Sequence, residues 1–218
     1  MPGVLISDFD GTMTRRDFYR LILQEHLPPG TTDFWREYLD GRISHFEALR
    51  LTFANAPIGE QALVDVARRM ELDPALPQSI ARLREQGWSV VVASAGCAWY
   101  IRVLLQELIS EVTIHANEGD VKTNHLAMEL PTTSAYFSRE TGIDKAAIVR
   151  EAITRGGTVA FAGDGLPDLA PALLVPASWR FARADLAEQL NRVGESYTPF
   201  SRWSEIADKI LERDARTA

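Results

Sequence analysis

Paired acids stand directly after an apolar run near the start of the chain. Residues 4–6 are Val-Leu-Ile, and Asp8 and Asp10 follow two positions apart, before Gly11 and Thr12. Side chains two positions apart in an extended chain point to the same side, so both acids can face one ligand. This combination at a strand end suits magnesium-assisted phosphoryl transfer. An ordinary acidic turn has the same composition, so these residues alone leave both interpretations open.

Polar sequences also follow two later apolar runs. The valine-rich residues 89–93 precede Ser-Ala-Gly at 94–96, and residues 158–162 precede Gly-Asp-Gly-Leu-Pro-Asp at 163–168. In an open parallel sheet, ligands bind at the carboxyl ends of the strands. Three strands that present polar groups at one edge are therefore a far more specific signal than any single motif. Lys145, at the start of a predicted helix, adds a cation to this set.

Composition and charge limit the class of protein. The chain has 218 residues, of which 46% are hydrophobic and 24% charged, as in a globular protein with one large core or a core and a smaller lobe. The net charge is −7 and no basic stripe occurs, which argues against nucleic-acid binding. Because no apolar run has the length of a membrane span and no secretory signal is recognisable, we expect a cytoplasmic protein without membrane contact. The single cysteine, Cys97, excludes an intrachain disulfide, and the sequence does not decide the oligomeric state.

Hydrophobic periodicity predicts an α/β protein with a helical insertion after the first strand. Strands alternating with helices predict a parallel sheet covered on both faces, whereas the segment between the first two strands has helical spacing only. Ser44 and Glu47 have the spacing of a capping box within that segment. We expect strands at 4–6, 89–93, 111–115, 126–130 and 158–162, later helices at 76–86, 98–108 and 145–155, and a frayed end at 213–218.

The order of these motifs resembles that of the haloacid dehalogenase-like (HAD) superfamily. The match consists of Asp-Phe-Asp-Gly-Thr at 8–12, Ser-Ala-Gly at 94–96, Lys145 and the acidic sequence at 163–168. Within the superfamily, the chain is similar to phosphatases with a helical cap between the first two motifs. The resemblance spans residues 4 to about 172.

That resemblance implies both a domain organisation and a mechanism. A Rossmann-like core would comprise residues 1–14 and 77–218, and the cap residues 15–76. Asp8 would be the nucleophile that forms an aspartyl-phosphate, while Asp10 would protonate the leaving oxygen and then activate water. Mg²⁺ would be held by Asp8, by Asp164 and by the backbone carbonyl of Asp10. The phosphate group would be bound by Thr12, Ser94, Ala95, Gly96 and Lys145. Asp168 would orient a water or the Lys145 ammonium, and this ammonium would neutralise charge during the reaction.

Substrate specificity is expected to reside in the cap. In phosphoserine phosphatases, which the chain also resembles, an acid that contacts the substrate amine would align with Asp17, and a substrate arginine lies near Arg50. The position where that arginine is expected holds Thr52, a departure that argues against phosphoserine. Arg15 and Arg16 follow the first motif and could reach an anionic substrate or lie in solvent.

The leading hypothesis is a Mg²⁺-dependent phosphatase for a small phosphorylated metabolite, because a lid over the strand edge excludes water and large partners. The motifs and residues 181–186 also resemble the methionine-salvage phosphatases of 2-hydroxy-3-keto-5-methylthiopentenyl-1-phosphate. Phosphoserine phosphatase or phosphotransferase activity is the nearest alternative. A metal-independent dehalogenase would not need Asp10 or the pair Asp164 and Asp168, and a non-catalytic binding domain would be expected to lack part of the set.

Overall fold

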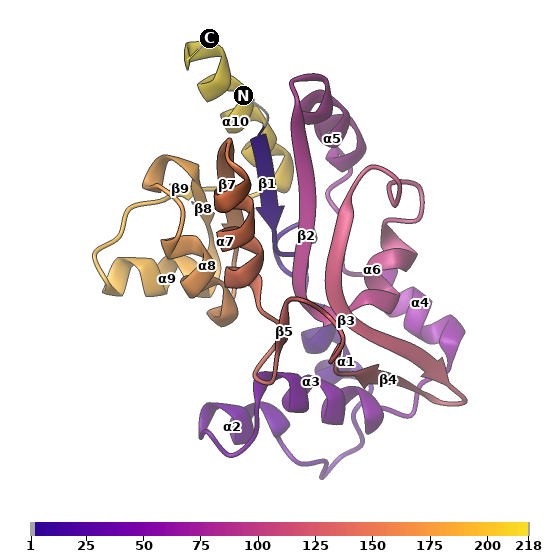
Figure 1. The fold of residues 1–218 in the computed structure, drawn as a ribbon. Helices are drawn as coiled ribbons and strands as arrows, with labels where there is room; N and C mark the ends of the chain where they lie inside the picture. The colour runs from indigo at the N-terminus through magenta and orange to yellow at the C-terminus, as the bar shows by residue number, and fades with distance from the viewer. Residues whose placement is uncertain (1–2, 218) are drawn as a thin grey trace.

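A seven-stranded sheet forms the centre of the structure, a computed structural model that describes residues 3–217 (Figure 1). In spatial order the strands are β4 (His125–Glu129), β3 (Thr113–Lys122), β2 (Trp88–Cys97), β1 (Gly3–Ser7), β7 (Thr158–Gly163), β8 (Arg180–Ala182) and β9 (Thr198–Pro199). β1 pairs in parallel with both β2 and β7, whereas β3 and β4 are antiparallel. The predicted α/β fold with a mostly parallel sheet is confirmed, and the three motif-bearing strands are direct neighbours.

Alternate residues of the central strands face opposite sides of the sheet, and helices cover both sides. Leu5 and Ala160 belong to one hydrophobic core, and Ile6 and Phe161 to the other. Because both faces are buried, these strands have continuous apolar sequences rather than alternating ones. The first core contains α5 (Leu76–Glu85), α6 (Ala98–Leu104) and α10 (Trp203–Thr217); the second contains α7 (Lys145–Arg155), α8 (Leu169–Leu173) and α9 (Ala184–Arg192).

The segment between β1 and α5 is helical, as predicted, and lies beyond the carboxyl end of β1 (Figure 1). It contains α1 (Phe18–Glu25), α2 (Phe34–Leu39), α3 (His45–Ala54) and α4 (Glu60–Arg68). The side chains of Asp17, Asp33 and Ser44 cap the first three helices by accepting backbone N–H bonds. These caps fix where the helices begin and so determine which residues face the end of the sheet.

The chain enters and leaves this helical segment at one place. Residues 13–16 run beside residues 70–73, with an antiparallel bridge between Thr14 and Leu72. Apart from these two chain crossings, the segment is also attached to the turn between β3 and β4. There the N–H of Ile58 donates to the carbonyl oxygen of Asn124 at 2.7 Å. The segment is therefore tied to the sheet by adjacent chain crossings and by the β3–β4 hairpin.

The structure corrects several sequence-based boundaries. β3 continues to Lys122, and α6 ends at Leu104 rather than near residue 108. The expected fraying of residues 213–217 is wrong, because α10 continues to Thr217 and Arg213 lies over the ring of Phe181 at 5.3 Å; Ala218 lies outside the described residues. Also observed are β5 (Phe137–Ser138), β6 (Gly142–Ile143) and the 3₁₀ turns η1 (Leu166–Asp168) and η2 (Ala177–Trp179).

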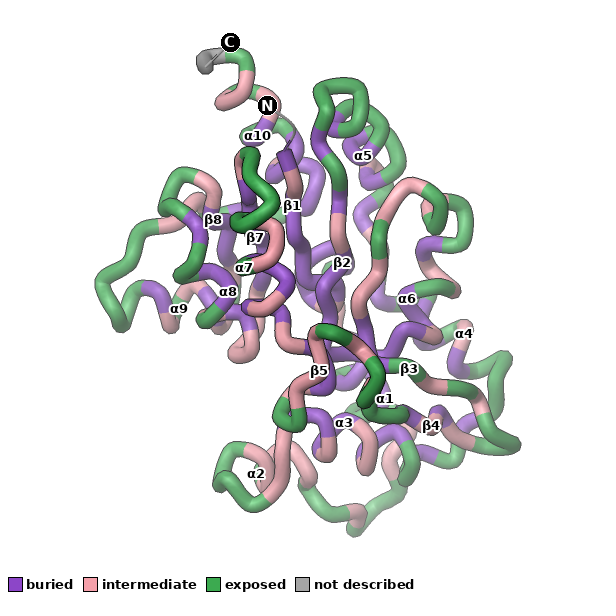
Figure 2. Tube along the Cα trace, viewed as in Figure 1, coloured by how far each residue is buried: buried purple, intermediate pink, exposed green. Residues whose placement is uncertain are grey.

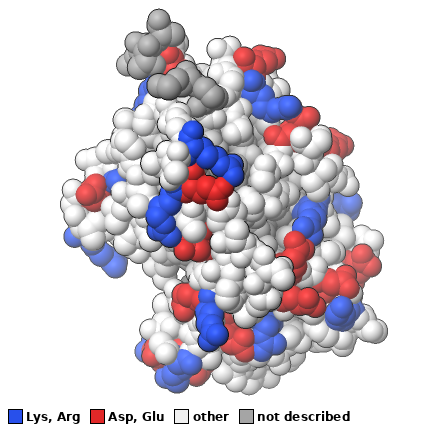
Figure 3. All heavy atoms as spheres, viewed as in Figure 1, with Lys and Arg blue, Asp and Glu red and all other residues white. Residues whose placement is uncertain are grey.

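The surface carries charges of both signs. On the face seen in Figure 3, Lys and Arg residues are interspersed with Asp and Glu residues. Along residues 3–217, no helix has both the length and the apolar composition needed to cross a bilayer.

Candidate active site

The carboxyl ends of β1, β2 and β7 open into a cavity of about 750 Å³. The sheet side of this cavity presents Asp8, Asp164 and Lys145, whereas the opposite side is formed by residues of α1, α2 and α3 such as Tyr19 and Trp35. The motifs that lie far apart in the sequence are thus brought to one edge of the sheet, as predicted.

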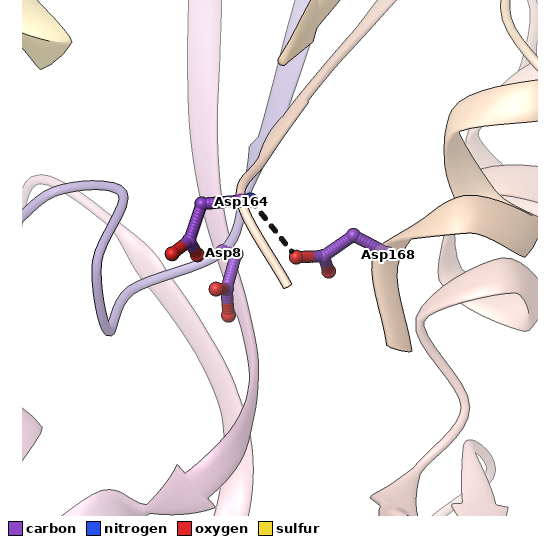
Figure 4. Close-up of side chains that lie close together, drawn as sticks. All are labelled: Asp8, Asp164 and Asp168. Carbon is purple, nitrogen blue, oxygen red and sulfur yellow. Dashed lines mark hydrogen bonds between the residues drawn. The ribbon is translucent and has the colours of Figure 1, made fainter. Parts of the chain in front are cut away.

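A buried network of ion pairs and hydrogen bonds lies on the sheet side of the cavity. Nζ of Lys145 donates to Oδ1 of Asp8 at 2.7 Å and to Oδ1 of Asp168 at 2.6 Å. Oδ2 of Asp168 accepts from the backbone N–H groups of Asp164, drawn in Figure 4, and Gly165. Burial alone would lower the pKa of Lys145, but the charges of Asp168 and Asp8 outweigh it and raise that pKa. Lys145 is therefore a fixed positive charge beside Asp8.

Three carboxylates converge from two strand ends. Oxygen atoms of Asp8, Asp164 and Asp168 lie within 4.8 Å of one another (Figure 4). Burial, together with the charges of Asp8 and Asp168, raises the pKa of Asp164 well above its ordinary value. Gly11 has φ +68°, and a Cβ there would overlap the Asp164 carboxylate, so the turn is built around this group. Three carboxylates beside a single lysine leave an excess of negative charge, and such an oxygen-rich cluster fits a hard cation such as Mg²⁺.

The two oxygens of Asp10 are held by different parts of the fold. Oδ1 accepts from the N–H of Phe18 at 3.1 Å, and Oδ2 accepts from the Tyr100 hydroxyl at 2.8 Å. Burial is the main cause that raises the pKa of Asp10, followed by the charges of Asp17 and Asp8. No motif in the sequence indicated the hydrogen bond from Tyr100 to Asp10.

The expected phosphate-binding residues do not all face the cavity. Ser94, Ala95 and Gly96 line it, and the Ser94 hydroxyl accepts from the Gly96 N–H at 2.9 Å. Thr12 is not among the lining residues; its hydroxyl donates to Oδ1 of Asp164 at 3.1 Å. Cys97, which follows this loop, is buried, and burial raises the pKa of its thiol to about 12, so it is held as an unreactive thiol.

The haloacid dehalogenase-like hydrolase family matches this chain over residues 5–172. The chain belongs to that family. The resemblance stated from the motifs is thereby confirmed, over nearly the same residues. The match includes all four motifs, from the paired acids after β1 to the acidic turn after β7.

The hydrolase is similar in sequence to proteins named as phosphatases, and in fold to solved structures of phosphatases. It is 26% identical over 210 residues to the 2-hydroxy-3-keto-5-methylthiopentenyl-1-phosphate phosphatase of Exiguobacterium sibiricum, covering 94% of this chain and 95% of that protein. The corresponding protein of Geobacillus kaustophilus is also 26% identical, with 95% and 94% covered. A substrate-bound phosphoserine phosphatase structure has a TM-score of 0.70 at 16% identity, covering 98% of each chain, which shows a shared fold.

The two predicted specificity residues of the hydrolase differ in position. Asp17 lines the cavity, although one of its oxygens accepts from the N–H of Arg20 at 3.0 Å and so caps α1. Arg50 is not among the lining residues, and its Nε donates to the Glu47 carboxylate at 2.9 Å on the same helix. The structure therefore brings Asp17, but not Arg50, to the site.

Arginines line the rim of the hydrolase cavity. Arg15 and Arg16 both do so, and Arg15 forms an exposed ion pair with Glu71 at 3.2 Å. Arg183 also lines it, and its guanidinium donates to the carbonyl oxygen of Thr14 at 3.0 Å. Burial lowers the pKa of Arg183 despite its neighbouring acids. The cavity lining thus combines these arginines with acids such as Asp17 and Asp185.

Opposite the carboxylates lies an aromatic wall, defined here as Tyr19, Trp35 and His45. The ring centroids of Tyr19 and Trp35 are 5.2 Å apart, and those of Trp35 and His45 are 5.6 Å apart. His45 is 6% exposed, and its Nδ1 has no hydrogen-bond partner among the described residues. Burial, with a contribution from Lys145, lowers the pKa of His45 to about 4, so the ring is neutral near pH 7. No motif in the sequence pointed to His45 as a residue of the cavity.

Proposed function

We propose that this hydrolase is a Mg²⁺-dependent phosphatase that hydrolyses a small phosphorylated metabolite through an aspartyl-phosphate on Asp8. The observation that carries the proposal is the buried contact of Lys145 with Asp8 and Asp168 beside Asp164, within one cavity. A cation that neutralises a carboxylate and an incoming phosphoryl group together is suited to phosphoryl transfer.

In the first step, a carboxylate oxygen of Asp8 attacks phosphorus while the bond from phosphorus to the ester oxygen breaks. Asp10 gives its proton to that leaving oxygen, which departs as an alcohol. In the second step, Asp10 takes a proton from water as the water oxygen attacks phosphorus. This releases inorganic phosphate and restores Asp8. Held at both oxygens by Phe18 and Tyr100, Asp10 is oriented for both proton transfers.

The other site residues have supporting roles in this proposal. Asp8, Asp164 and the backbone carbonyl of Asp10 would hold Mg²⁺, which supplies positive charge to the phosphoryl oxygens. Lys145, Ser94 and the N–H group of Ala95 would bind those oxygens directly. The Gly96 N–H, which donates to the Ser94 hydroxyl, would hold that hydroxyl in place. Asp168 keeps Lys145 in place, and Thr12 keeps Asp164 in place, since each already makes that contact.

We further propose that residues 15–76 act as a cap that selects the organic part of the substrate. The aromatic wall offers a largely apolar surface with two neutral polar atoms that are unpartnered among the described residues, the Tyr19 hydroxyl oxygen and Nδ1 of His45, which suits an uncharged group better than an amino acid. The named relatives act on a phosphate ester with a methylthio group, and such a group fits this surface. Phosphoserine is the second candidate, because Asp17 lines the cavity and could bind an amine.

The non-phosphatase alternatives are less well supported. A dehalogenase needs a nucleophilic acid but neither Asp10 at its present place nor the Asp164 cluster. A binding domain has no use for a buried lysine clamped between two carboxylates, since burying such charges is costly.

A panel of phosphate esters assayed with Mg²⁺ tests the proposal. We expect turnover of p-nitrophenyl phosphate and of small alkyl phosphates that disappears after exhaustive chelation and returns with Mg²⁺. Asp8→Asn keeps the size of the side chain, but an amide is a poor nucleophile. The turnover rate should therefore fall by several powers of ten, each of which corresponds to about 1.4 kcal/mol of barrier. Undiminished turnover in the chelated enzyme, or a tenth of the wild-type rate in a folded Asp8→Asn variant, would contradict the proposal.

A further inference from the structure

Tyr100 makes a specific contact with the proposed acid and base, Asp10. It lies on α6, is 1% exposed and lines the cavity, and its hydroxyl donates to Oδ2 of Asp10 at 2.8 Å. The other oxygen of Asp10 accepts from the N–H of Phe18, the first residue of α1. One oxygen is thus held by a core helix and the other by the helical segment.

The tyrosine ring is fixed by its neighbours. It stacks on the ring of Phe18, with centroids 4.2 Å apart and planes inclined by 19°, and it lies 6.4 Å from the ring of Phe9. Gly96 contributes space, because a Cβ at this position would overlap the Tyr100 hydroxyl. The hydroxyl therefore has a prepared place, between the glycine of the proposed phosphate loop and the Asp10 carboxylate.

Packing alone does not require this hydroxyl. A phenylalanine would make the same ring contacts with Phe18 and Phe9, whereas a buried hydroxyl is favourable only with a hydrogen-bond partner. A phenol is protonated near neutral pH, so the Tyr100 hydroxyl can donate to Asp10 across the 2.8 Å contact. The contact is thus a hydrogen bond that the Tyr100 hydroxyl donates to the Asp10 carboxylate.

We propose that Tyr100 is a positioning residue whose hydroxyl holds Asp10 in the orientation needed to protonate the leaving oxygen and then to activate water. This inference rests on the proposed function, and in particular on Asp10 as acid and base. Proton transfer depends on the alignment of donor and acceptor, so a carboxylate free to rotate about its side-chain bonds loses part of its effect. Phe18 alone would leave Oδ2 without a fixed donor.

Tyr100→Phe tests this with two kinds of leaving group. For an alkyl phosphate, whose leaving oxygen must be protonated, we expect kcat/KM to fall about 10- to 100-fold, a part of the usual contribution of general acid catalysis. For p-nitrophenyl phosphate, whose leaving group departs as an anion, kcat/KM should fall less than about threefold, because this parameter reports only the steps up to phosphoryl transfer. A loss confined to poor leaving groups is not explained by altered packing.

Two further variants make each outcome decisive. Trp99→Phe changes the neighbouring aromatic residue on α6 and should keep the wild-type ratio of alkyl to p-nitrophenyl phosphate. If Tyr100→Phe loses the same factor with both esters, or none with either, its hydroxyl does not position Asp10. Asp10→Asn separates this failure from that of the proposed function: an Asp10→Asn enzyme with wild-type activity on alkyl phosphates would remove the acid role itself, whatever Tyr100 does.

Discussion

Individual charges in the site are buried in a way that stability alone does not favour. Lys145 and Asp168 have side chains 4% and 1% exposed, and their pairing with Asp8 must offset the loss of hydration of all three groups. Removing Lys145 would leave two buried carboxylates facing each other. Such an arrangement is expected where a fixed charge is needed for chemistry. Burial, and then the charges of Asp8 and Asp168, raise the pKa of the neighbouring Asp164.

His45 should make the protein less stable in mild acid. Its folded-state pKa is about 4, below the ordinary value, so between these pKa values the unfolded chain binds a proton that the folded one does not. Stability is then lost as pH falls, by up to about 1.4 kcal/mol per pH unit. Urea unfolding measured at pH 7 and at pH 4.5 gives the loss in the free energy of unfolding between these two pH values. We expect this loss to be about 2 to 3 kcal/mol smaller in His45→Gln than in the wild type.

The control for this measurement is His125→Gln, which removes a histidine that is only half-buried on β4. It tests whether a change in the pH dependence of the free energy of unfolding is specific to position 45 or follows any replacement of histidine by glutamine. Identical pH dependence in His45→Gln and the wild type would show that His45 is protonated in the folded protein as readily as in the unfolded chain.

At the residue scale, the sequence predicted the charged groups and missed the aromatic ones. Asp8, Asp164 and Lys145 belong to motifs at strand or helix ends, and the topology of a parallel sheet brings such ends together. Tyr100 and His45 carry no such signal, because a single aromatic residue in an amphipathic helix has the same pattern whether it packs or faces a cavity. Their roles depend on tertiary contacts only.

Among the secondary-structure elements, α2 is unusual because none of its residues is buried (Figure 2). It is short and rich in aromatic residues, and Asp33 caps it. Its Trp35 contacts Tyr19 and His45 at the cavity. A helix that contributes so little to the core is better explained by the surface it presents to a ligand.

Replacing Trp35 should therefore change substrate preference more than stability. We expect Trp35→Ala to lower kcat/KM for hexyl phosphate about tenfold relative to ethyl phosphate, because the longer chain loses apolar contact while the leaving oxygen is chemically alike. Leu39→Ala on the same helix is the matched control, since Leu39 is 54% exposed and does not line the cavity. Equal changes for both esters would exclude Trp35 from the binding of the organic group.

The sequence predicted those helices and strands whose hydrophobic periodicity is strong. It missed the polar extension of β3 and the C-terminal helix α10. The valine-rich strand and the helix that begins at Lys145 have clear patterns, and both are present. The extension of β3 alternates polar and small residues and looks like a loop, because its pairing with β4 and not its own apolar content stabilises it. α10 has buried residues at helical spacing, Trp203, Ile206 and Ile210, but it carries no motif that marks it in the sequence.

At the scale of the whole molecule, the site joins parts of the chain that are otherwise separate. β1, β7 and α7 contribute acids and lysine, and the helical segment closes the cavity from the other side. The carboxylates that meet there repel one another in the folded state, within a protein whose net charge is already −7. A bound divalent cation should therefore stabilise the fold as well as support the reaction.

Mg²⁺ should raise the melting temperature. At a concentration about 100-fold above the dissociation constant, binding to the folded state contributes about 2.7 kcal/mol, which for a chain of this size corresponds to roughly 5 to 10 °C. Thermal unfolding should be followed with Mg²⁺ and with chelator, in the wild type and in Asp164→Asn, which should lose most of the shift. An equal shift in both proteins would mean that the cation binds elsewhere.

The most direct test of the central claim is to detect a phosphoryl group on Asp8. In Asp10→Asn, p-nitrophenyl phosphate can still phosphorylate the enzyme because its leaving group needs no proton, while the second step lacks its base. Acid quenching followed by mass spectrometry of peptides should find one added phosphoryl group on the peptide that contains Asp8, sensitive to hydroxylamine, and none in an Asp8→Asn, Asp10→Asn double variant. A phosphoryl group on a different residue, or turnover with none on the protein, would contradict the account.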